Sequence, residues 1–215
     1  MTPSSVPPAD LFPPDLPSGT LHLKAAASAA EQKRLLKAVS RVEKKAPFRR
    51  PQTRSGTFSA EITNCGDVGW WSDSTGYRYT PTQPYSASPW PKMPAAFTEI
   101  LASIVVKTPW QEFVSDVCLI NHYDKGSKMG LHQDKDESDF TQPIVTFCIG
   151  ATADFLVGGA KRSDQPQVIT VESGDVVVMG AASRLLFHGV RKIYPGTSPL
   201  LGLDGRISLT FRKAL

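Results

Sequence analysis

Arg206-Ile207-Ser208-Leu209-Thr210-Phe211-Arg212, close to the end of this 215-residue chain, alternates strictly between polar and apolar residues. A period of two is typical of a β-strand with one face in a hydrophobic core, so the four polar side chains are expected to share the other face. Two guanidinium groups that face a buried pocket are unfavourable unless an anion meets them, and the arginine fork pairs well with carboxylates. The stretch therefore favours a strand that lines a pocket for a dicarboxylate. Taken alone, it also allows two surface arginines on an edge strand.

Strand signals dominate the chain before this stretch. Short β-branched and apolar runs, separated by Gly or Pro turns, predict strands at residues 117–123, 143–149, 154–157, 167–172, 175–179 and 185–190. Many short strands with such turns are typical of two packed sheets in a jelly roll. The predicted fold class is mainly β with flanking helices (α+β), built as a double-stranded β-helix.

Helical periodicity appears in two segments. Residues 29–45 place apolar side chains such as Leu35 and Val39 on one side and end before Pro47, and residues 95–106 form a second candidate. Between them the chain is rich in Gly, Pro, Ser, Thr and aromatic residues, with strand-like pieces at 57–63 and 77–80. We interpret residues 46–92 as an excursion that forms a lid over the pocket.

Length and composition indicate one globular domain. With 40% hydrophobic residues the chain can bury a substantial core, and we assign residues 21–215 to that domain. Residues 1–20 are expected to form a flexible tail, since six prolines fall within the first seventeen residues.

Charge and cysteine content bound the surroundings of the protein. The formal net charge is +4, and nine Lys or Arg residues fall within residues 28–54, where they could meet phosphates or form a solvated helix face. The three cysteines lack Cys-x-x-Cys spacing, which favours buried thiols in a reducing compartment. No apolar stretch approaches the roughly 20 residues of a membrane span, so we expect a cytoplasmic protein with no membrane partner.

A second motif carries chemistry. Leu131-His132-Gln133-Asp134 contains His-x-Asp, and in an extended chain both polar side chains project to one face. His188 follows an apolar run and can complete the set. Two histidines and one carboxylate occupy one face of an octahedral iron(II) ion and leave three positions for a chelating cosubstrate and dioxygen. An isolated His-x-Asp is more often a bystander, and the paired arginines are what favour the metal hypothesis.

Together these motifs resemble the iron(II)/2-oxoglutarate dioxygenases, and further segments narrow the resemblance to the AlkB family of nucleic-acid demethylases, especially its bacterial members. The segments are TNCG at 63–66 with Gly69-Trp70, GYRY at 76–79, PWP at 89–91, CLIN at 118–121 with Tyr123, LHQDKDE at 131–137, GDVVV at 174–178, SRL at 183–185 and His188-Gly189. The resemblance runs from about residue 28 to residue 213 in the family's order.

The resemblance implies the roles of the metal and cosubstrate residues. His132, Asp134 and His188 are expected to be the catalytic iron(II) ligands. The cosubstrate 2-oxoglutarate is expected to contact Asn121, Tyr123, Arg206, Ser208, Thr210 and Arg212. Ser208 departs from the family pattern, which usually has asparagine there, so the pocket loses one amide. Alternation along residues 118–123 places His122 on the opposite face from Asn121, and we therefore exclude His122 as a ligand.

The resemblance also implies how substrate is bound. The alkylated base is expected between Trp70 and the ring of His132, with Tyr77 near the sugar and phosphate and with Asp136 and Arg162 beside the base. An acidic Asp136 is sensible there, because 1-methyladenine and 3-methylcytosine are cationic.

The implied activity is oxidative dealkylation of N-alkylated bases in single- or double-stranded DNA, or in RNA, by a monomer. In it 2-oxoglutarate and O2 give succinate and CO2, and the methyl group leaves as formaldehyde. One alternative is a dioxygenase of the same fold that acts on a protein or small metabolite, which the aromatic lid disfavours. Another is a non-catalytic nucleic-acid-binding module, which would be expected to have lost one of the three ligands or two arginines.

Overall fold

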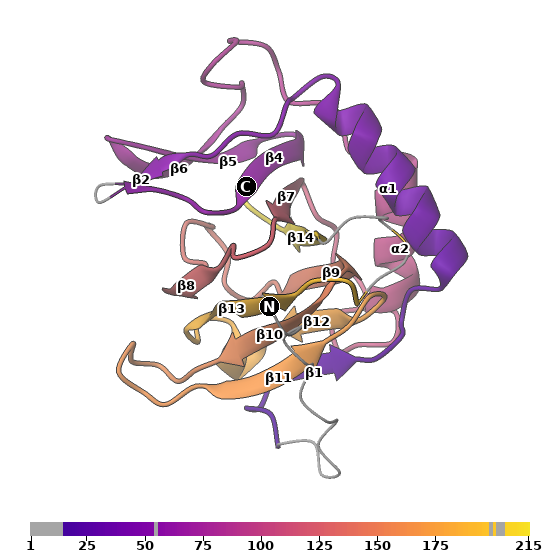
Figure 1. Cartoon of the computed structure of the whole chain (residues 1–215), viewed down its shortest axis with the longest axis vertical. Coiled ribbons are helices and arrows are strands. Elements are labelled where there is room, and N and C mark those ends of the chain that lie inside the picture. Colours follow the sequence, from indigo (N-terminus) through magenta and orange to yellow (C-terminus); the bar gives the residue numbers. More distant parts are fainter. Residues whose placement is uncertain (1–14, 54–55, 198–199, 201–204) are drawn as a thin grey trace.

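Two antiparallel sheets face each other in the computed structural model, which describes residues 15–53, 56–197, 200 and 205–215 (Figure 1). The six-stranded sheet has the order β1 (Thr20–Leu23), β12 (Val176–Met179), β9 (Ile144–Gly150), β14 (Arg206–Arg212), β7 (Val117–Tyr123) and β4 (Glu61–Gly66). The four-stranded sheet has the order β11 (Gln167–Val171), β10 (Thr152–Val157), β13 (His188–Tyr194) and β8 (Met129–His132). This arrangement confirms the predicted jelly roll.

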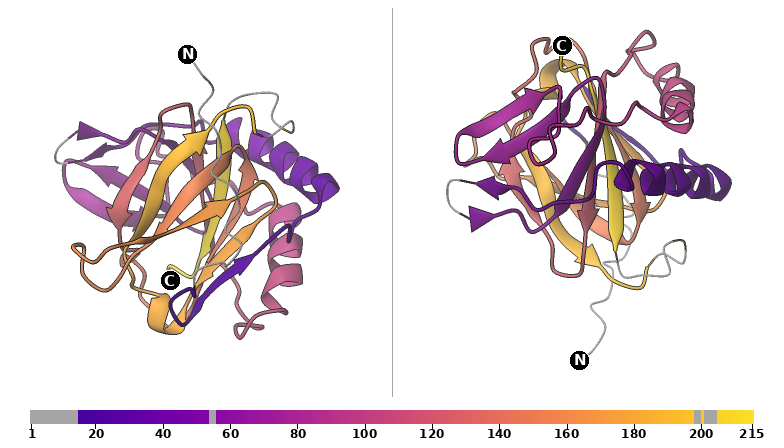
Figure 2. Two further views of the ribbon diagram at one scale, coloured as in Figure 1. Left: turned by 60° about the horizontal axis from the view of Figure 1, so that its bottom comes forward. Right: turned by 90° about the horizontal axis from the view of Figure 1, so that it is seen from above.

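Two helices and two small hairpins surround these sheets. The helices α1 (Ala29–Glu43) and α2 (Ala95–Val105) lie together on one side of the molecule (Figures 1 and 2). One hairpin joins β2 (Gln52–Thr53) to β3 (Gly56–Thr57), and the other joins β5 (Gly69–Asp73) to β6 (Gly76–Thr80).

The alternation of β14 divides the interior into two cores. Ile207, Leu209 and Phe211 pack with α1 and α2 in the core on the outer face of the six-stranded sheet. A second core, which includes Val177 and Phe155, lies between the two sheets. The polar residues of β14 face this inner side, because successive side chains of a strand point to opposite faces. One strand therefore supports both the helix packing and the interior of the jelly roll.

Helix α1 forms as the sequence predicts. Ser28 caps its first turn in a reciprocal arrangement with Glu31, which satisfies backbone donors that the helix leaves free. Leu35, Val39 and Val42 are buried against the sheet, whereas the basic side chains of this helix are exposed. The exposed positions match a solvated face.

Several element boundaries differ from the prediction. The predicted strand at 185–190 is wrong in its first half, because the short 3-10 helix η1 (Ala181–Ser183) runs into a turn and β13 begins only at His188. In that turn the backbone N–H of Leu186 donates to the carbonyl of Ser183 at 3.0 Å. The predicted strand at 57–63 is also wrong, because β3 and β4 are separate. The sequence does not predict the strands β1, β2, β5 and β8, since each is short and lacks a sustained alternation.

Some predictions concern residues outside the described part of the chain. Residues 1–14 of the predicted tail and Arg54 of the basic cluster lie there, and β1 starts at Thr20. Within the described ranges, every helix is too short or too polar to cross a membrane.

Candidate active site

A cavity of about 620 Å³ opens between the two sheets and the β5–β6 hairpin. It is lined by every residue predicted for the site: His132, Asp134 and His188; Asn121, Tyr123, Arg206, Ser208, Thr210 and Arg212; and Trp70, Tyr77, Asp136 and Arg162. The sequence-derived candidates, which span residues 70 to 212, therefore meet in one space.

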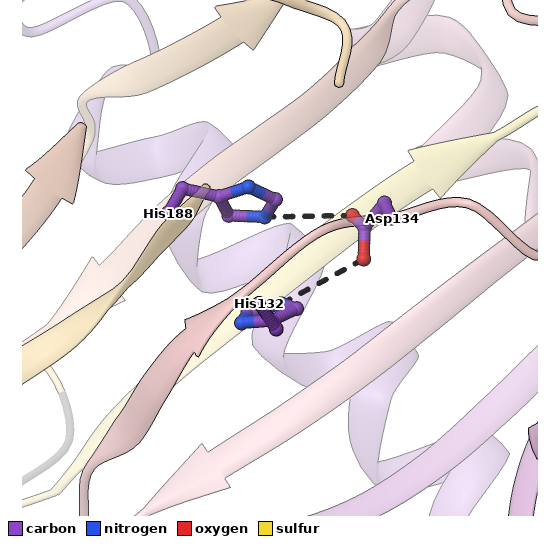
Figure 3. Close-up of side chains that lie close together, drawn as sticks. All are labelled: His132, Asp134 and His188. Atoms are coloured by element: carbon purple, nitrogen blue, oxygen red, sulfur yellow. Dashed lines mark ion pairs between the residues drawn. The ribbon is translucent and has the colours of Figure 1, made fainter. Parts of the chain in front are cut away.

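Two neighbouring strands of the four-stranded sheet and one loop bring the candidate metal ligands together. His132 ends β8, and His188 begins β13 as its direct partner across the antiparallel pair. Asp134 follows two residues after β8, and its carboxylate oxygens lie 3.7 Å from His132 Nε2 and 3.6 Å from His188 Nε2 (Figure 3). The three ligand atoms lie within 4.8 Å of one another, which is the spacing expected around one ion.

Backbone carbonyls orient both imidazole rings. His132 Nδ1 lies 2.9 Å from the carbonyl of Gly130, and His188 Nδ1 lies 3.1 Å from that of Leu186. A carbonyl only accepts, so each Nδ1 is the donor and each Nε2 is the ring atom directed to the site. Burial, together with the adjacent His188, lowers the pKa of His132 to about 4, so this ring is neutral at pH 7. Neutral imidazole is the form that binds metal.

Asp134 is held as a carboxylate. It is buried, and burial alone would raise its pKa, but Arg212 and the two histidines hold the pKa of Asp134 well below its usual range. Arg212 Nη2 donates to one oxygen of Asp134 at 2.8 Å. Two imidazoles and an ionised carboxylate match the donor set of a non-haem iron(II) centre with open positions.

The floor of the cavity has unsatisfied polar atoms. Arg206 is 1% exposed, and its Nη1 donates to the carbonyls of Ala151 and Val171. The Nε atoms of Arg206 and Arg212 and the Oδ1 atom of Asn121 are buried without a hydrogen-bond partner among the described residues. Buried guanidinium groups with free donors favour an anionic guest, because an unpaired buried donor carries its full desolvation penalty. Two such groups fit a dicarboxylate.

The strand register sets the order of these floor residues. Across β7, Tyr123 lies opposite Arg206 and Asn121 lies opposite Ser208. Thr210 faces Thr146 on β9, and their hydroxyl groups are 3.4 Å apart. His122 points away from this floor and contacts Glu61 at 3.2 Å, which agrees with its exclusion as a ligand.

Aromatic residues of the β5–β6 hairpin lie at the mouth of the cavity. The rings of Trp70 and Tyr77 are stacked, with centroids 5.5 Å apart and an interplanar angle of 16°. Trp70 Nε1 donates to the Asp136 carboxylate at 2.8 Å. Arg162 donates to the carbonyl of Leu131, and its guanidinium lies 5.0 Å from the ring centroid of Phe187. The mouth therefore combines a flat aromatic surface with charges of both signs.

A buried network beside the site was missed by the sequence analysis. Glu137 accepts from the Tyr79 hydroxyl at 2.5 Å and from Arg184 at 3.0 Å, and it lies 3.6 Å from Arg212. Burial raises the pKa of Tyr79, which keeps its hydroxyl protonated as the donor. Glu137 and Arg184 lie in irregular segments where hydrophobic periodicity predicts nothing, so only the three-dimensional structure reveals their pairing.

Comparisons with known proteins agree with this geometry. Residues 19–212 match the model of the 2OG-Fe(II) oxygenase superfamily. The chain is 42% identical over 201 residues to the alpha-ketoglutarate-dependent dioxygenase AlkB of Escherichia coli, covering 93% of this chain and 92% of that protein. It is 33% identical over 121 residues to the nucleic acid dioxygenase ALKBH1 of Mus musculus, covering 56% of this chain and 31% of that protein.

A solved structure extends the likeness to three dimensions. "The structure of OsALKBH1" matches with a TM-score of 0.81 at 30% identity, covering 92% of this chain and 98% of that chain. The fold, the donor set and the length of the sequence match all agree. The chain therefore belongs to the AlkB family of iron(II)- and 2-oxoglutarate-dependent dioxygenases.

Proposed function

We propose that this enzyme oxidatively removes alkyl groups from base nitrogens of nucleic acids, with 1-methyladenine and 3-methylcytosine as substrates. The observation that carries the proposal is that the His132–Asp134–His188 group and the buried arginines Arg206 and Arg212 line one cavity, with Trp70 at its mouth. Relatives with the names AlkB and nucleic acid dioxygenase support the same substrate class.

His132, Asp134 and His188 would hold iron(II), and the floor would hold 2-oxoglutarate. Arg206, which has Tyr123 opposite it and Asn121 two residues further along β7, would bind the distal carboxylate together with these two residues. Arg212 would bind the carboxylate next to the ketone. When bound, the iron supplies the oxidising chemistry that uses dioxygen and 2-oxoglutarate to oxidise the alkyl carbon. The protein's own residues bind, orient and exclude competing groups.

The mouth of the cavity would select the base. A flipped base stacks on aromatic rings whatever its identity, and Trp70, whose ring stacks on that of Tyr77, would offer such a ring. His132 would contact the base from the metal side. The Asp136 carboxylate lies at the edge of the Trp70 ring and would attract the positive charge of a methylated base. Arg162 would contact the base or the strand at the rim.

Residues 46–92 would act as the lid; within that range β4 joins the six-stranded sheet, and the β5–β6 hairpin carries Trp70 and Tyr77. We propose a single dioxygenase domain over residues 21–215 that works as a monomer in the cytoplasm, on single- or double-stranded DNA and on RNA.

The test is anaerobic reconstitution with iron(II), followed by a formaldehyde assay with 2-oxoglutarate and oxygen. The panel contains oligonucleotides with one 1-methyladenine or one 3-methylcytosine, the same oligonucleotides without the methyl group, and a methylated peptide. We expect formaldehyde from the methylated oligonucleotides alone. Release from the peptide alone would favour the protein-modifying alternative instead.

Replacing the aromatic platform should weaken substrate binding. We expect Trp70→Ala to lower affinity for a methylated single strand by about 1–3 kcal/mol, the contribution of one lost base stack. Decarboxylation of 2-oxoglutarate without nucleic acid should persist, because Trp70 lies at the mouth and not on the cosubstrate floor. Fluorescence anisotropy and succinate formation measure the two effects.

Trp71→Ala is the matched control for this variant. Trp71 is the next residue of the same strand, and its ring packs on Tyr85 at 5.7 Å. We expect its affinity for methylated strands to stay near that of the parent. Equal affinity losses in both variants would mean that the hairpin matters as a whole and that Trp70 is no specific platform.

Restoring the family's amide should tighten cosubstrate binding. Ser208 is buried opposite Asn121, whose Oδ1 has no partner in the described structure. We expect Ser208→Asn to lower the Kd of 2-oxoglutarate several-fold, in keeping with about 0.5–1.5 kcal/mol for one hydrogen bond, with turnover broadly intact. Calorimetry of the metal-loaded protein measures the change, with Ser208→Ala as the control that adds no amide. Loss of activity in Ser208→Asn would show that the floor has repacked around the smaller residue.

A further inference from the structure

Among the described residues, the side chain of Arg184 makes its hydrogen bonds to one segment, residues 134–142. Its three guanidinium nitrogens donate to the carbonyl of Gln142 at 2.9 Å, to the carbonyl of Asp134 at 2.6 Å and to the carboxylate of Glu137 at 3.0 Å. The guanidinium also lies 5.3 Å from the ring centroid of Phe140. One buried side chain thus binds the loop that carries the Asp134 ligand at both of its ends and in its middle.

Arg184 also stands next to the turn that orients the second histidine. Two residues after Arg184, the carbonyl of Leu186 accepts from His188 Nδ1. The contact between the two segments is reciprocal, because Gln133 Nε2 donates to the carbonyl of Leu185 at 2.6 Å. Hydrogen bonds therefore hold the Asp134 loop and the His188 turn together close to the two candidate ligands.

The carboxylate partner of Arg184, Glu137, connects these hydrogen bonds to the proposed cosubstrate floor. Glu137 is fully buried and also lies 3.6 Å from Arg212, which in turn donates to Asp134. Such a buried pair is a poor source of net stability, because removing two charges from water offsets most of their attraction. Its geometry, three donors on three fixed acceptors, is instead suited to fixing the position of a backbone.

We propose that Arg184 is a positioning residue, which sets the separation between Asp134 and His188 and so determines the affinity of the centre for its metal. Arg184 is not among the residues that line the cavity, so it acts only through Asp134, Glu137 and the 184–187 turn. The inference rests on the proposed metal site. Residues that orient metal ligands without touching the ion commonly change affinity by about 10- to 100-fold when replaced.

The experiment is an anaerobic titration of the full-length protein with Mn(II), a redox-stable probe of the same donor set, followed by electron paramagnetic resonance of the free ion. We expect Arg184→Met to raise the Kd of Mn(II) by about 10- to 100-fold. Arg184→Lys keeps the charge but cannot reach three acceptors, and should give a smaller increase. Glu137→Gln, which keeps the shape of the acceptor, should also weaken binding and carries the test if Arg184→Met fails to fold.

Arg191→Met is the control for loss of an arginine–carboxylate pair. Arg191 lies on β13 and donates to the buried Asp154 at 2.8 Å, away from the cavity lining. Urea unfolding of each apoprotein measures stability separately from metal affinity. We expect Arg191→Met to lose stability while its Kd for Mn(II) stays within twofold of the parent.

The outcomes separate this inference from the proposed function. If the parent protein binds Mn(II) and the Arg184 and Glu137 variants bind it equally well, the positioning role is wrong and Arg184 only stabilises the fold. If the parent and a His188→Ala variant bind Mn(II) equally weakly, the metal site itself is wrong.

Discussion

His188→Ala should abolish formaldehyde release from methylated oligonucleotides. The variant leaves one imidazole and one carboxylate, and two ligands cannot define the facial geometry that three provide. His188 is buried at the start of β13, so alanine also leaves Asp134 without one of its two histidine neighbours. We expect both Mn(II) affinity and turnover to fall below detection. His132→Ala and Asp134→Ala should behave alike.

His122→Ala is the matched control for the ligand variants. This histidine lies on β7 near the site in sequence and space, but its ring contacts Glu61 on the far side of the strand. We expect metal affinity and turnover close to those of the parent. Turnover near the parent rate in His188→Ala, without added metal-binding buffer, would remove His188 from the ligand set.

Arg212→Met should damage both cosubstrate binding and stability. Methionine has a similar length but no charge, so the two carboxylates of Asp134 and Glu137 lose a buried partner. Breaking a buried ion pair in this way costs about 3–5 kcal/mol of folding free energy. The loss of one charge-assisted hydrogen bond should weaken the binding of 2-oxoglutarate by about 1.5–3 kcal/mol, which raises its Kd roughly 10- to 150-fold. Urea unfolding and calorimetry with 2-oxoglutarate measure the two losses.

The neighbouring Lys213, which is not among the residues that line the cavity, provides the control for Arg212→Met. Lys213 pairs with Asp116 at 2.9 Å and is partly exposed. Lys213→Met should cost less folding free energy than Arg212→Met, because Lys213 is 39% exposed and Asp116 still accepts from two backbone N–H groups, and it should leave 2-oxoglutarate affinity unchanged. Equal cosubstrate affinity in Arg212→Met and the parent would exclude Arg212 from the cosubstrate site.

The sequence predicts the sheet strands best where alternation is sustained. β14 and β7 match their predicted limits of 206–212 and 117–123, because each has a buried face along its whole length. The start of β13 was misplaced because Leu185, Leu186 and Phe187 have strand-like composition, yet the preceding 3-10 turn at Ala181–Ser183 controls the backbone. Local turn geometry overrides composition at such points.

The site was predictable for residues on strands and less so for residues in loops. Alternation places Arg206 and Arg212 on one face, and the motif spacing gives His132 and Asp134. By contrast, nothing in the pattern of residues 137–142 or 181–187 indicates that Arg184 forms hydrogen bonds with the Asp134 loop. Contacts between two irregular segments depend on long-range packing, which no local period records.

Because β14 has one face in the helix-side core and the other in the cavity, a ligand that binds in the cavity should stabilise the entire molecule. Ile207, Leu209 and Phe211 pack in the helix-side core, while the residues between them line the floor of the cavity. A ligand at 100 times its Kd adds about 2.7 kcal/mol to the free energy of unfolding of a protein that binds it only when folded. For a chain of this size that corresponds to a rise of about 5–11 °C in the melting temperature. Thermal-shift screening of 2-oxoacids and their competitors should therefore detect occupancy of this floor without any turnover assay.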